Sequence, residues 1–213
     1  MKTNQLIDML STNLEPVKSG QLKRTLGLTL VAGGAAAFCV MLATVGLRTE
    51  ANGGLQLGFL FVKLLFTLTL IGVGTALLGK LIRPGQDSMN LYMVIFLAFL
   101  VIGVAGVVAL IFRPTTAWGS MILGTEWWMC AFCIPGFAIV PFAGLIWALR
   151  RGAPTNLRRT GAIAGLVAGA LGAVAYAFHC PDDSIPFIAF WYGAMVALCA
   201  AIGAILGRRL LRW

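Results

Sequence analysis

The sequence predicts an all-α, polytopic membrane protein, a bundle of six transmembrane helices with a short amphipathic helix at its N-terminus. Hydrophobic residues make up 60% of the 213-residue chain and charged residues only 11%, against about 45–50% and about 25% in soluble domains. With a mean hydropathy of +0.93, the chain has too little polar surface to enclose a single soluble core. Its long apolar stretches lack the alternation of barrel strands, so helices are expected.

Six apolar stretches approach the roughly 20 residues that a helix needs to cross a bilayer. They lie at 26–47, 57–79, 91–112, 130–149, 160–178 and 186–206. The chain therefore divides into a tail, residues 1–25, and a transmembrane domain, residues 26–213. Pro135 and Pro141 predict a bend in the fourth span. Glycines at 161, 165, 169 and 172 predict close packing of the fifth span, against a neighbouring span or a second copy, so the oligomeric state stays open.

The distribution of basic residues predicts that both termini are cytoplasmic in a bacterial inner membrane. Under the positive-inside rule, cytoplasmic segments hold most of the Lys and Arg residues. With the N-terminus inside, 13 basic residues are cytoplasmic, only Arg48 and Arg113 lie outside, and Lys63 falls within a span. The basic clusters separate apolar runs and indicate contact with anionic lipid, not direct binding of nucleic acid.

The N-terminal tail has the spacing of a short amphipathic helix that needs a surface to lie on. Its apolar positions recur every three or four residues, at Leu6, Met9, Leu10, Leu14 and Val17. The polar face carries Asp8 and Glu15 where a lipid-bound helix typically carries Lys or Arg. A hydrophobic groove on a protein partner is therefore as plausible a binding surface as the bilayer.

Two cysteines are predicted at the periplasmic boundary, where they face the oxidising side of the membrane. Cys130 begins the fourth span and Cys180 lies between the fifth and sixth. At similar depth they could form a disulfide if their Cα atoms approach within about 4.4–6.8 Å. Cys133, one turn deeper, is expected to pack in the bundle, and His179 to cap the fifth helix. A soft metal site formed by these thiols and His179 is the less favoured alternative.

Lys63 is the one charge placed inside a predicted span, which makes it a functional candidate by default. Its long stem favours a structural anchor that reaches Glu126 or the Asp182–Asp183 pair across the bundle. The spans lack the converging polar groups of a transporter. The chain also has one His, no buried acid pair and no phosphate-binding loop, so neither an enzyme activity nor a bound cofactor is expected.

An ordered set of segments along the whole chain resembles the NrsF family of membrane anti-sigma factors. The segments are the opening residues 1–18, Lys63 followed by residues 83–85, the segment 127–130, residues 150–155, the segment 179–184, and residues 191–192 with the closing residues 207–213. The segment 179–184 and the terminus 207–213 are the most specific of them. Cys133 lies outside the matching pattern.

The resemblance implies a six-span regulator that holds an extracytoplasmic-function sigma factor and releases it under heavy-metal or oxidative stress. It implies that the tail binds the sigma factor and that Cys130 and Cys180 are the sensor, with transient metal binding possible at this pair. The main alternative from the residues is a membrane thiol oxidoreductase coupled to quinone, and a small permease is a third.

Overall fold

The computed structural model describes residues 21–48, 54–82, 89–152, 154 and 156–212, which form helices and contain no strand. Six long helices follow in order: α2 (Gln21–Thr44), α3 (Gly54–Leu81), α4 (Met89–Ile111), α6 (Trp127–Leu149), α7 (Leu157–Ala177) and α9 (Gly193–Leu210). Short elements join them: η1 (Thr115–Ala117), α5 (Trp118–Leu123), α8 (Ile185–Phe187) and η2 (Ile188–Tyr192). Six segments are long and apolar enough to cross a membrane. The predicted all-α bundle of six long apolar helices is therefore confirmed, and the amphipathic helix predicted for the tail lies outside the described residues.

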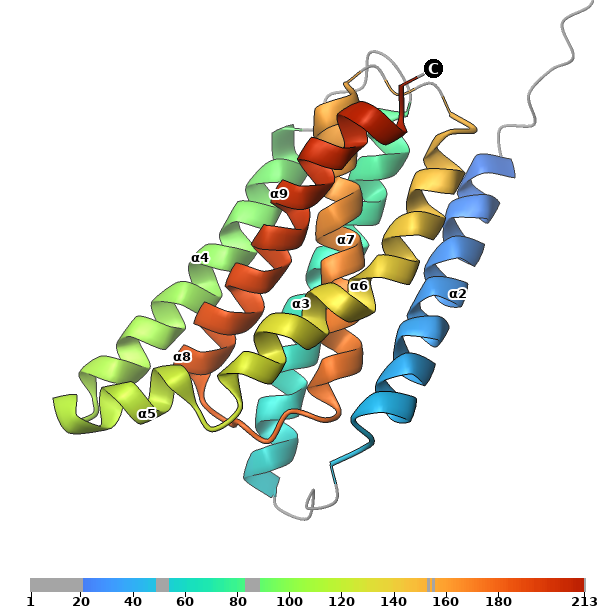
Figure 1. The fold of residues 1–213 in the computed structure, drawn as a ribbon. Coiled ribbons are helices and arrows are strands. Elements are labelled where there is room, and N and C mark those ends of the chain that lie inside the picture. Colours follow the sequence, from blue (N-terminus) through green and yellow to red (C-terminus); the bar gives the residue numbers. More distant parts are fainter. Residues whose placement is uncertain (1–20, 49–53, 83–88, 153, 155, 213) are drawn as a thin grey trace, which may run out of the picture.

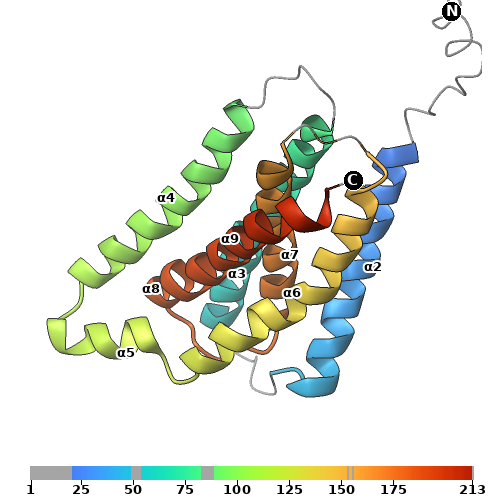
Figure 2. The ribbon, with the colours of Figure 1, turned by 45° about the horizontal axis from the view of Figure 1, so that its top comes forward.

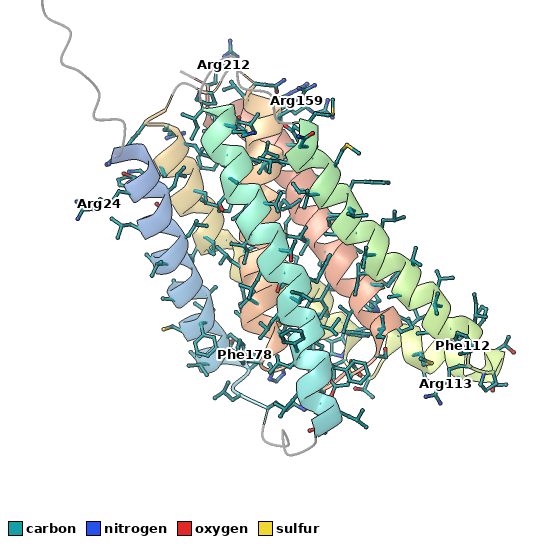
Figure 3. All side chains as sticks on the ribbon, turned by 180° about the vertical axis from the view of Figure 1, so that it is seen from behind. Arg24, Phe112, Arg113, Arg159, Phe178 and Arg212 are labelled. Atoms are coloured by element: carbon teal, nitrogen blue, oxygen red, sulfur yellow. The ribbon has the colours of Figure 1, made fainter. Side chains whose placement is uncertain are left out.

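The helices run between two ends of the bundle, as Figure 1 shows. Arg24, Arg159 and Arg212 lie at one end, called here the Arg24 end, and Phe112, Arg113 and Phe178 lie at the other (Figure 3). The second end also carries Cys180 and is called the Cys180 end. Because the number of crossings is even, α2 begins and α9 ends at the Arg24 end.

Helix α7 is the centre of the bundle, and its small residues allow its neighbours to approach closely. It has its most extensive contacts with α9, then with α6, α3 and α2. Gly161 and Gly165 meet the backbone of Gly203 and Cys199 on α9, where an added Cβ would collide with main-chain atoms. The glycine stripe thus packs against spans of the same chain, the first of the two alternatives that the sequence left open.

Helix α6 remains helical across Pro135 and Pro141, and its axis curves toward α2 in Figure 1. It begins at Trp127, three residues before the predicted span. Residues 113–129, which the sequence analysis left without an element, contain η1 and α5, and Figure 2 shows α5 lying across the Cys180 end between α4 and α6. The run 118–123 is too short to stand out by length against the neighbouring spans.

The other spans overlap their predicted ranges with shifted ends. Helix α3, at 28 residues, is the longest, and α2 begins at Gln21, inside the predicted tail. The last span contains, between α8 and α9, a π-helical turn, η2, that periodicity does not reveal. Such turns insert one residue into a helix and are frequent at functional sites. Helix α4 is peripheral, with Ile102 and Gly106 as its buried residues.

Candidate functional site

Cys130 and Cys180 lie together, buried, at the Cys180 end of the bundle. Cys130 stands in the first turn of α6, where its amide donates to the carbonyl of Glu126 at 3.3 Å. Cys180 follows α7, and its amide donates to the carbonyl of Tyr176 at 3.0 Å. The side chains are 0% and 1% exposed and interact electrostatically, and neither forms a disulfide. The structure therefore joins two thiols from different spans in one enclosed site.

Lys63 reaches this site from the middle of the Cys180 half of α3. It is 1% exposed, and its Nζ donates to the carbonyl of Cys180 at 3.3 Å and to Oδ1 of Asp183 at 3.2 Å. Of the carboxylates that the sequence suggested as partners of Lys63, Asp183 forms the ion pair. The ammonium also lies 5.9 Å from the centre of the Tyr192 ring. A buried lysine is tolerated because a carboxylate and a carbonyl replace its lost hydration.

The residues that directly follow α2 bind the same short segment, residues 178–184, which is called here the Cys180 segment. Arg48 donates to Oδ2 of Asp183 at 2.8 Å, so Asp183 bridges Arg48 and Lys63. The amide of Arg48 donates to the carbonyl of Phe178 at 3.2 Å. Nδ1 of His179 lies 3.1 Å from the carbonyl oxygen of Gly46. Gly46 has φ of +75°, a conformation that suits glycine at the end of a helix.

Asp182 holds the opposite side of the Cys180 segment to the start of α6. Its Oδ1 accepts from the amide and hydroxyl of Thr125 at 2.8 and 2.9 Å, and its Oδ2 accepts from the amide of Glu126 at 3.1 Å. Gly124 turns beside this carboxylate with φ of +63°, and an added Cβ would collide with it. Ser184, the last residue of the Cys180 segment, caps α8, because its hydroxyl accepts from the amide of Phe187.

The remaining sulfur and imidazole groups do not complete a metal centre. Cys133 is half-buried one turn along α6. Nε2 of His179 lies 3.9 Å from Oε2 of Glu126. Within the described ranges, no group of three or more His, Cys, Asp and Glu residues could hold a metal ion. The four-ligand site formed by the thiols at 130, 133 and 180 with His179 is therefore not assembled.

Two tyrosines complete the surroundings of the thiols, and sequence analysis gave them no role. Tyr176 on α7 and Tyr192 at the end of η2 are both fully buried, with ring centroids 6.2 Å apart. The hydroxyl of Tyr176 has no hydrogen-bond partner among the described residues, and the side chain of Tyr192 interacts with the Cys180 thiol. The signal that could have found them is compositional, because the chain has only three tyrosines and these two flank Cys180 in the sequence.

Burial lowers the reactivity of Cys180 in this resting arrangement. Loss of solvent raises the pKa of the Cys180 thiol, and the positive charge of Lys63 opposes that rise. Thiolates, not thiols, are the nucleophiles and metal ligands. Burial therefore disfavours the reactive thiolate form of Cys180, and the neighbouring Lys63 charge favours it.

A small cavity adjoins the ion cluster between α2, α3 and α7. It has a volume of about 180 Å³, and its lining includes Arg48, Lys63 and Asp183. It leaves space for the side chains of these residues to change position. The proposed sigma-factor-binding positions Leu6, Met9, Leu10, Leu14 and Val17 lie outside the described residues.

Comparison with known proteins matches this chain over its whole length. A family model described as "Negative regulator of sigma F" covers residues 10–213. The "Probable anti-sigma-F factor NrsF" of Azospira oryzae is 32% identical and the "Anti-sigma-F factor NrsF" of Caulobacter vibrioides 30% identical, each over 100% of both chains. No solved structure matches. The chain therefore belongs to the NrsF family of negative regulators of sigma F.

Proposed function

We propose that this chain is an anti-sigma factor of the inner membrane that holds an extracytoplasmic-function sigma factor through its N-terminal tail. It releases the sigma factor when Cys130 and Cys180 react with an oxidant or a heavy-metal ion. The relatives named as anti-sigma-F factors support the regulatory role, which requires no enzyme activity.

The observation that carries the sensing role is the placement of the thiols relative to the tail. Two spans contribute one buried thiol each at the Cys180 end, while α2, which continues from the tail, begins at the opposite end. The basic residues support a cytoplasmic Arg24 end, because Arg24, Arg159 and Arg212 gather there (Figure 3). The thiols then face the periplasm and the tail faces the cytoplasm.

The chemistry at the thiols is a two-electron oxidation or a proton exchange. An oxidant such as a hydroperoxide takes two electrons and two protons from Cys130 and Cys180, which leaves a disulfide, an alcohol and water. A thiophilic divalent ion instead displaces the two thiol protons and binds both sulfurs. Both reactions draw α6 toward the Cys180 segment after α7. Helix shifts of about 1–2 Å are a known mode of switching in packed bundles.

A reporter for the sigma factor, combined with cysteine variants, tests this proposal. Replacing Cys130 and Cys180 together with Ser should leave the sigma factor bound and abolish its release by diamide or cadmium. Cys39→Ser is the matched control, because Cys39 is an exposed thiol elsewhere on the bundle. A double variant that still responds refutes the sensor assignment. Deletion of residues 1–20 should abolish co-purification of the sigma factor, and its persistence refutes the role of the tail.

A further inference from the structure

The chain contains a direct connection between the Cys180 segment and the helix that continues from the tail. Cys180 is flanked by residues whose partners lie at the end of α2. Phe178 accepts from the amide of Arg48, the imidazole of His179 lies against the carbonyl of Gly46, and Asp183 accepts from the guanidinium of Arg48. The ring of Phe178 also packs edge-on against Phe38, with centroids 5.5 Å apart. Arg48 Nη1 also donates to the carbonyl of Cys180 at 3.5 Å. Five contacts therefore link a segment of seven residues to α2 and to the residues that directly follow it.

These contacts differ from the attachments that hold α2 elsewhere. The rest of α2 packs against α6 and α7 through small or apolar side chains. Gly33 approaches the backbone of Pro141, and Gly34 approaches Leu171. Apolar packing is non-directional, whereas a charged hydrogen bond also fixes the direction and separation of the two groups that it joins. The polar contacts at the Cys180 end therefore fix the position of α2 along its own axis.

We propose that Arg48 is the positioning residue through which a change at Cys180 reaches the N-terminal tail. Asp183 is held on one side by Lys63 of α3 and on the other by Arg48, at 3.2 and 2.8 Å. When Cys180 is drawn toward Cys130, Asp183 moves with it and carries Arg48. The short connection of residues 45–47 passes this movement to α2, which shifts along its axis together with the tail that precedes it. The cavity beside Arg48, Lys63 and Asp183 provides the space for this movement.

This inference rests on the proposed function and adds a second connection to it. Helix α6, which carries Cys130, packs directly against α2 through apolar contacts. The Arg48–Asp183 pair adds a charged connection from the Cys180 segment to the residues that follow α2. Lys63 is buried and bound to both Cys180 and Asp183, so one cation ties together the two residues that move in this proposal.

The test uses the full-length protein in lipid nanodiscs with its bound sigma factor and diamide as the oxidant. Diamide takes two electrons and two protons from a pair of thiols and leaves a disulfide and a hydrazine. Three quantities are measured: sigma factor bound at rest, free thiols at Cys130 and Cys180 after treatment, and sigma factor released. For the wild type, we expect loss of thiols and release together.

At rest, Arg48→Gln should retain the sigma factor as the wild type does. With diamide, it should lose the free thiols of Cys130 and Cys180 as the wild type does, but release about fivefold less sigma factor or require about fivefold more diamide for the same release. Arg48→Lys, which keeps a charge for Asp183, should restore release. Arg113→Gln is the matched control, because Arg113 lies at the same end of the bundle and far from α2 (Figure 3). A merely structural role for Arg48 would change retention at rest, which this proposal leaves unchanged.

A second variant decides the question if Arg48→Gln fails to reach the membrane. Two glycines inserted between Thr44 and Val45 leave Arg48 and Asp183 able to pair but make their connection to α2 compliant. After diamide treatment, this variant should also lose the free thiols of Cys130 and Cys180 but keep the sigma factor bound. Release with the wild-type dose and amplitude, in either variant, overturns the inference. Failure of the proposed function is distinguishable, because it appears as a wild type that does not release or a double cysteine variant that does.

Discussion

The carboxylate of Asp183 compensates two cations, so the structure predicts unequal effects for removing the partners of its ion cluster. Asp183→Ala leaves Lys63, which is 1% exposed, and Arg48 without a counter-charge. Lys63→Met instead removes the buried charge and leaves Asp183 paired with Arg48. We therefore expect Asp183→Ala to destabilise the fold strongly, Lys63→Met to have a small effect, and the double variant to be more stable than Asp183→Ala alone.

The magnitude follows from the distance and the burial. At 3.2 Å, Lys63 and Asp183 attract each other by about 5 kcal/mol at an effective dielectric constant of about 20. Removing one partner of a buried pair typically costs about 3–5 kcal/mol. Because 16% of the Asp183 side chain is exposed, we expect the lower half of that range. Replacing the buried charge with an apolar group of similar volume costs about 1 kcal/mol or less.

The assay is thermal unfolding of the purified variants in nanodiscs, followed by tryptophan fluorescence. At about 2–4 °C per kcal/mol for a chain of this length, Asp183→Ala should lower the apparent melting temperature by about 6–16 °C and Lys63→Met by about 4 °C or less. Adding Lys63→Met to Asp183→Ala should recover part of the loss. Equal losses for the two single variants, or no recovery in the double variant, would refute the electrostatic account of this cluster.

Three further predictions test other parts of the structure. Gly165→Ala should lower the free energy of unfolding by about 1–3 kcal/mol, because its methyl group meets the backbone of α9, whereas Gly72→Ala, which meets nothing within 4 Å, should not; equal melting temperatures would contradict this. Ser184→Ala should cost about 1 kcal/mol by removing the cap of α8, visible in the same melts. Burial raises the pKa of Cys180 and so favours the protonated thiol in the folded state. The free energy of unfolding should therefore fall as the pH rises above about 8.5, the pKa of free cysteine. In a Cys130→Ser background, the rate of alkylation of Cys180 should rise with pH through a midpoint above that value. A midpoint at or below it would contradict the burial of this thiol.

Hydropathy alone predicted the six-helix fold because crossing a bilayer imposes a length and a composition that few soluble helices share. The same argument placed Cys130 and Cys180 at similar depth, since each lies at the end of a span. It could not choose between Glu126, Asp182 and Asp183 as the partner of Lys63, because that choice depends on how α3 is rotated against α7. Rotation is set by packing, which an almost uniformly apolar helix does not encode in its own sequence.

Other features of the site depend on contacts that have no local signature. Arg48 stands out in the sequence only as one of two basic residues predicted to lie outside the cytoplasm, and its contact with Asp183 spans 135 positions. The π-helical turn that positions Tyr192 has the same composition as an ordinary apolar helix. The tail remains a prediction from periodicity, since the residues that carry it lie outside the described part of the chain.

The burial of α7 has a consequence for how the protein is made. Of the six spans, α7 is the least apolar and has the largest buried share, since Gly and Ala replace the larger aliphatic side chains that lipid-facing helices carry. Insertion of a helix into the bilayer depends on the apolarity of its side chains, so α7 gains little from lipid contact by itself. We expect its stable integration during synthesis to require the partner helices that surround it, with α9, the last to leave the ribosome, completing the process.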